Sequence, residues 1–151
     1  MTNQLTARTV TSLTLAGELP TDQRPALVYL ASLSAGSRRT MRASLNIIAD
    51  LLQHDADALS INWAAVRFQH VAAVRSVLIE RYSAASANKM LAALRGVLKA
   101  AWRLDQMTAD DYTRAVDVDR VTGSTLPRGR ALTAGEINGL INACHLTGRD
   151  L

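Results

Sequence analysis

The stretch NKMLAALRGVLKAAWRLD, residues 88–105, decides the fold class because its apolar and polar residues separate with a helical period. The apolar side consists of Met90, Leu91, Leu94, Val97, Leu98 and Trp102. The polar side, an arc of roughly 120° at about 100° per residue, consists of Asn88, Lys89, Arg95, Lys99 and Arg103. This separation predicts a long amphipathic helix that begins after Ser83 or Ser86 and runs to about Leu104.

The polar side of this helix contains no acidic residue before Asp105. Three of its cations, Arg95, Lys99 and Arg103, are spaced four residues apart. Like charges at that spacing destabilise a helix by roughly 0.2–0.5 kcal/mol per pair. The residues between the cations are small, and Gly96 costs a helix about 1 kcal/mol relative to alanine. Close approach of a ligand and tight packing of another helix explain Gly96 equally well.

A second helix, predicted from Arg38 to Gln53 with Ser37 as its N-cap, shows the same plan more weakly. Its polar side consists of Arg38, Arg39, Arg42 and Asn46, and its apolar side consists of Met41, Leu45, Ile48 and Leu52. Cations in a first helical turn oppose the helix dipole, so they indicate an anion that could also meet the N-terminal amides.

Each basic side has two interpretations. It is a solvated surface, or it binds DNA with cations at the phosphates and with Asn46 and Asn88 at base edges. The net charge of +4 is compatible with both.

The composition favours packed helices. The 151 residues are 48% hydrophobic but only 4% aromatic, and strands prefer aromatic and β-branched side chains. Further helices are predicted at about 22–34, 63–81 and 109–116, with Trp63 and Trp102 as core anchors. No apolar run is long enough to span a membrane, and the N-terminus lacks a signal-peptide pattern. The single Cys144 excludes a disulfide framework and fits a reducing cytosol.

Three domain boundaries follow from the same pattern. Residues 1–20 are predicted to be a flexible arm, residues 21–116 a helical domain and residues 117–131 a linker with Gly123, Pro127 and Gly129. A helix then restarts within residues 132–151, with Thr133 and Glu136 as a capping box. Its apolar face consists of Ile137, Leu140, Ile141 and Cys144.

No pattern of catalytic or metal-binding residues is evident. The three histidines, His54, His70 and His145, are scattered without a convincing ligand spacing. Asp110 and Asp111 fit the first turn of a helix, where carboxylates favour the dipole. We therefore expect no metal, no cofactor and no catalytic residues.

The order of these motifs resembles the N-terminal core-binding (SAM-like) domain of tyrosine recombinases, the phage-integrase family. The resemblance covers about residues 21–151 and is most specific over residues 63–112. It implies an orthogonal bundle of four to five helices, followed by a linker and one further helix. The second and fourth helices would face DNA, and the linker would offer Arg128 and Arg130 to phosphates. The last helix would open a truncated catalytic domain.

The resemblance also implies what the chain would do. It would bind double-stranded recombination-site DNA in the bacterial cytoplasm, at the nucleoid, without cutting it, because the family's catalytic arginine, lysine, histidine and tyrosine residues lie beyond "GRDL". A full-length parent would act as a tetramer on DNA, and this chain would be a monomer in solution. Two alternatives remain: a helical protein-interaction module, and a naturally short competitor that occupies recombination sites without catalysis.

Overall fold

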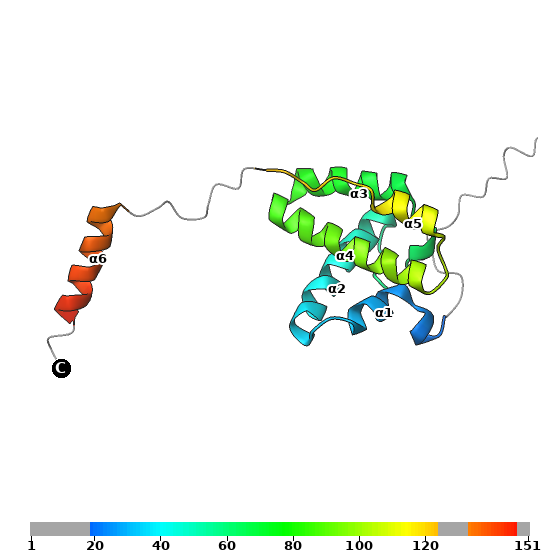
Figure 1. The fold of residues 1–151 in the computed structure, drawn as a ribbon, viewed down its shortest axis with the longest axis horizontal. Coiled ribbons are helices and arrows are strands. Elements are labelled where there is room, and N and C mark those ends of the chain that lie inside the picture. Colours follow the sequence, from blue (N-terminus) through cyan, green and yellow to red (C-terminus); the bar gives the residue numbers. More distant parts are fainter. Residues whose placement is uncertain (1–18, 124–132, 148–151) are drawn as a thin grey trace, which may run out of the picture.

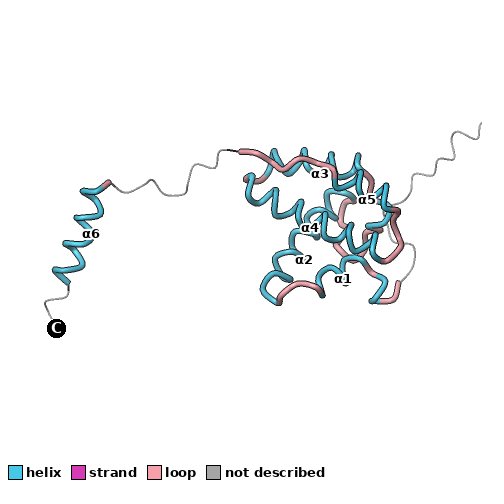
Figure 2. Tube along the Cα trace, in the orientation of Figure 1, coloured by secondary structure: helices cyan, strands magenta, loops and turns pink. Residues whose placement is uncertain are grey.

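The computed structural model describes residues 19–123 and 133–147 (Figure 1). Its helices are η1 Thr21–Gln23, α1 Pro25–Ala31, α2 Ala35–Leu52, η2 Trp63–Ala65, α3 Phe68–Arg81, α4 Ala84–Arg103, α5 Ala109–Val116 and α6 Ala134–Thr147. In these two ranges Figure 2 shows helices and loops without a strand. The predicted all-α fold is therefore confirmed.

The centre of the bundle is α4, which packs against α1, α2, α3, α5 and η2. Figure 1 shows α2 crossing it. Five of the six apolar residues predicted to face the core are buried, and Leu98 is fully so. The exception is Trp102, which is 38% exposed and stacks on Tyr112 with 5.3 Å between the ring centroids. The prediction of Trp102 as a core anchor was therefore wrong, whereas Trp63 is buried.

Serine hydroxyls set the beginnings of the two long helices. The Ser34 hydroxyl accepts a hydrogen bond from the Ser37 amide at 3.4 Å, so α2 begins at Ala35 and not after Ser37 as predicted. Of the two candidate caps for α4, Ser83 is the one whose hydroxyl accepts, from the amide of Ser86. Both caps satisfy amides that an α-helix leaves unpaired at its first turn.

The segment predicted as one helix over 63–81 is divided. It forms η2 and α3, with Arg67 in an extended conformation between them as the N-cap of α3. The Arg67 amide donates to Nδ1 of His70 at 2.9 Å. The indole of Trp63 donates to the carbonyl oxygen of Ala58 at 2.8 Å, which fixes the loop before η2.

Residues 117–123, which we call the strap, belong to the bundle and not to a linker. Val121 is only 8% exposed, and the strap is held by side chains of α3 and α4. Residues 117–123, the beginning of the predicted linker, therefore pack on the helical domain. The predicted arm, up to residue 18, and the predicted phosphate contacts Arg128 and Arg130 lie outside the described residues.

The helix α6 has the predicted capping box. The Thr133 amide donates to Oε2 of Glu136 at 2.9 Å, and the Glu136 amide donates to Oγ1 of Thr133 at 3.4 Å. Ile137 and Ile141 are 45% and 49% exposed. None of the helices in the described ranges is long and apolar enough to cross a bilayer.

Candidate nucleic-acid interface

The first half of the polar side of α4 holds the strap. Asn88 makes a reciprocal pair of hydrogen bonds with Val121: its Nδ2 donates to the carbonyl oxygen, and its Oδ1 accepts from the amide, both at 2.8 Å. Nη2 of Arg95 donates to the carbonyl oxygen of Val118 at 2.7 Å. Both residues were predicted to contact DNA; in the structure both amide heteroatoms of Asn88 and one guanidinium nitrogen of Arg95 are hydrogen-bonded to the strap.

The second half of this side receives α1. A Cβ atom on Gly96 would lie 2.6 Å from Cζ and 2.8 Å from Cδ2 of Tyr29. Ala100, one turn later, is 6% exposed. The small residues of α4 thus make room for the ring of Tyr29. Of the two explanations that the sequence left open for Gly96, tight helix packing is the one that the structure supports.

Three cations of α4 take no part in these contacts. The side chains of Lys89, Lys99 and Arg103 are exposed and have no hydrogen-bond or ion-pair partner in the described part of the chain. They are spaced along the helix from its second turn to its last residue.

On α2 the predicted residues divide in the same way. Arg38 ties α2 to the end of α1, because its Nε and Nη2 donate to the carbonyl oxygens of Leu30 and Leu33 at 3.0 and 3.1 Å. Oδ1 of Asn46 accepts from the amide of Ala58 at 3.0 Å and holds the loop after α2.

Arg39 and Arg42 are exposed, and within residues 19–123 and 133–147 neither has an intramolecular partner. With Arg38 they border an open groove of about 560 Å³ between α1 and the beginning of α2. The floor of the groove is apolar and includes Leu27 and Leu30.

Charge is segregated between the elements. Together α2 and α4 carry seven cations and one carboxylate, Asp50, which lies in the last turn of α2. By contrast, α5 and the strap each carry two acidic residues: Asp110 and Asp111 on α5, and Asp117 and Asp119 on the strap. A like-signed pair of helices at the surface produces a local positive potential that attracts polyanions.

Sequence reasoning missed Arg75 and Tyr29. Nε of Arg75 donates to the carbonyl oxygen of Asp119 at 2.8 Å, so a third side chain holds the strap, from α3. Tyr29 carries no local signal for a contact with α4. The only indication in the sequence was Gly96 itself, an unfavourable residue inside a helix.

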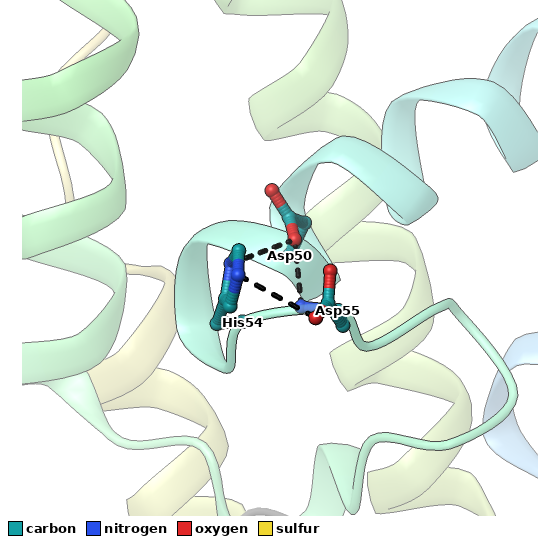
Figure 3. Close-up of side chains that lie close together, drawn as sticks. All are labelled: Asp50, His54 and Asp55. Carbon is teal, nitrogen blue, oxygen red and sulfur yellow. Dashed lines mark hydrogen bonds and ion pairs between the residues drawn. The ribbon is translucent and has the colours of Figure 1, made fainter.

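Asp50, His54 and Asp55 form a separate cluster at the end of α2 (Figure 3). The Asp55 amide donates to Oδ1 of Asp50 at 2.9 Å, and Asp55 has a positive φ of 61°, as is common where a chain leaves a helix. Nδ1 of His54 lies 3.7 Å from Oδ1 of Asp50, and Nε2 of the same ring lies 3.4 Å from Oδ2 of Asp55. Because all three side chains are exposed and their contacts close the end of α2, we assign the cluster to helix termination.

Comparison of the chain with protein-family models, with curated proteins and with solved structures gave no match. Membership of the tyrosine recombinases therefore stays a prediction from the sequence resemblance.

Proposed function

We propose that residues 19–123 form the DNA-binding domain of a site-specific tyrosine recombinase or integrase, and that α2 and α4 bind the backbone of recombination-site DNA. One observation carries the proposal. Five of the predicted contact residues are exposed cations that have no partner within residues 19–123 and 133–147, on two helices that share a single carboxylate: Arg39, Arg42, Lys89, Lys99 and Arg103.

This division of cations sharpens the predicted site. Arg38 and Arg95 hold the fold, and the five free cations take the phosphates. Oδ1 of Asn46 and both amide heteroatoms of Asn88 already hold loops, so we assign the described residues to contacts with the DNA backbone and not to base edges. Such contacts position a protein on a duplex and make its affinity depend on salt. Arg128 and Arg130 stay in the proposed set from the resemblance.

The test is the salt dependence of duplex binding, measured by fluorescence anisotropy. If all five cations contact phosphates, they should contribute roughly −4 to −5 to the slope of log affinity against log salt, since each contact contributes about −0.9, and contacts of Arg128 and Arg130 would make the slope steeper. Replacing Arg39 and Arg42 by glutamine should reduce the steepness by roughly 1.8. The matched control is Arg81→Gln with Arg114→Gln, two exposed cations on α3 and α5, which should leave the slope unchanged. Equal effects of the two double variants would contradict the assignment.

A protein-interaction module is the second candidate. It is favoured by Phe68 and Ile79, which lie on α3 and are 48% and 43% exposed. If the domain is a protein-interaction module, it should bind the duplex only weakly. Substitution of Phe68 and Ile79 by serine should then abolish capture of a protein partner and leave any DNA affinity unchanged.

A further inference from the structure

A crevice of about 210 Å³ lies between α1 and α4, within the basic side described above. Its lining residues are Val28, Tyr29 and Ser32 from α1 and Gly96, Lys99, Ala100 and Arg103 from α4. None of them is acidic. Two of them, Lys99 and Arg103, are cations of the last turns of α4 that have no partner in the part of the chain that the structure describes, so the crevice concentrates positive charge in a concave site.

Tyr29 is the one lining residue of this crevice with an aromatic hydroxyl group. Its Cζ, the atom that carries the hydroxyl, lies 2.6 Å from the position of a Cβ on Gly96. The phenol end of the ring is therefore held against the α4 backbone, and Lys99 and Arg103 follow on the same side of the helix, about one and two turns later. A tyrosine hydroxyl is protonated at neutral pH and can donate, and burial, which raises the pKa of Tyr29, acts in the same direction.

The hydroxyl of Ser32 already donates within the protein. It donates to the carbonyl oxygen of Tyr29 at 2.6 Å, so its proton is committed to the end of α1. The donors available in the crevice are therefore an ammonium, a guanidinium and a phenol. Several donors around one small concave site, with no acid among the lining residues, suit a compact oxyanion with several acceptor oxygens, as a phosphate group has.

We propose that this crevice binds a single phosphate group, and that the hydroxyl of Tyr29 donates to it beside Lys99 and Arg103. In the complex the phosphate is one of the DNA backbone, and in this respect the inference rests on the proposed function. It adds α1 to the contact surface that the resemblance assigned to α2 and α4.

The matched variant is Tyr29→Phe, which keeps the ring on Gly96 and removes only the hydroxyl. The full chain is titrated with inorganic phosphate, and its backbone amides are followed by NMR. Shifts should concentrate at Gly96, Lys99 and Arg103. Affinity should fall roughly tenfold in Tyr29→Phe, the loss of about one hydrogen bond to a charged group, and further in Lys99→Gln with Arg103→Gln. Shifts spread over Arg81 and Arg114, or no change in Tyr29→Phe, would overturn the proposal.

A duplex provides the second arm. Tyr29→Phe should weaken duplex binding without changing the salt slope, because the phenol is neutral, whereas Lys99→Gln should reduce the steepness by roughly 0.9. Duplex binding that is indifferent to Tyr29→Phe would overturn the crevice and leave the proposed function standing. Binding of inorganic phosphate in the crevice without duplex binding would support the crevice as a free-phosphate site and contradict the proposed function.

Discussion

Gly96 on α4 is matched to Tyr29 on α1: a Cβ at residue 96 would lie 2.6 Å from Cζ of the tyrosine ring. That separation is well inside van der Waals contact. Glycine is thus retained inside α4, at a cost in helix propensity of about 1 kcal/mol, by the packing of α1. The ring in turn shapes the crevice that contains Lys99 and Arg103.

Gly96→Ala should lower the free energy of unfolding by about 1 kcal/mol, because overpacking costs roughly 1–3 kcal/mol and the gain in helix propensity offsets only part of that. In the background Tyr29→Ala, the same substitution should raise the free energy of unfolding by about 1 kcal/mol, since the ring is gone and the propensity gain remains. Urea unfolding of the four proteins measures both effects in one cycle. The same sign in both backgrounds would show that Tyr29 is not the reason for the glycine.

Arg38 and Arg39 are adjacent in sequence but should respond differently to substitution by glutamine. Arg38→Gln removes two hydrogen bonds to the end of α1 and should lower the free energy of unfolding by about 1 kcal/mol. Arg39→Gln should leave stability within about 0.5 kcal/mol, as for most surface substitutions, and should weaken duplex binding.

Chemical denaturation and anisotropy on the same preparations separate these two roles. Each variant is the control for the other, because both lose one charge near the beginning of α2. A loss of stability in Arg39→Gln equal to that in Arg38→Gln would contradict the division between structural and free arginines.

The amphipathic pattern predicted the helices well, because helical periodicity is a local property of the chain. Leu91, Leu94 and Leu98 are buried as the pattern of α4 requires. Local capping chemistry was also recoverable: Thr133 and Glu136 pair as predicted, and Ser83 was one of two candidates. The predicted beginning of α2 was wrong, because Ser34 and not Ser37 is its N-cap.

The tasks of the polar residues could not be predicted in the same way, since they depend on distant partners. Asn88 and Val121 are 33 residues apart, and Arg95 and Val118 are 23 apart. A carbonyl oxygen in an irregular segment has no sequence signature, so these two side chains looked as free as Lys99. The periodicity identified the polar side of α4 but not which of its residues are engaged within the protein.

Asn88 should be a stability residue. Asn88→Ala removes both hydrogen bonds to Val121, each contributing roughly 0.5–1.5 kcal/mol, and should lower the free energy of unfolding by about 1–2 kcal/mol. The amide of Val121 should also exchange with solvent faster, because its acceptor is gone. Urea unfolding and hydrogen exchange measure the two effects, and Lys89→Ala is the exposed neighbour that should change neither. Unchanged exchange at Val121 would show that the strap is held without Asn88.

His70 should make the bundle less stable in mild acid. Burial, and secondarily the positive charge of Arg67, hold the pKa of His70 below its ordinary value, and its Nδ1 accepts from the Arg67 amide only when unprotonated. The unfolded chain therefore takes up this proton first, at a pH of about 6.5. The contribution of His70 is present above that pH and is lost as the pH falls through it toward the lower folded-state pKa.

His70→Gln keeps a side-chain acceptor at the third position of the helix but cannot titrate. Unfolding free energies at descending pH should show the native protein losing stability relative to His70→Gln, while Gln69→Ala, an exposed neighbour without a titrating group, should follow the native pH profile. A constant difference between the native protein and His70→Gln across that range would place the proton-sensitive group elsewhere.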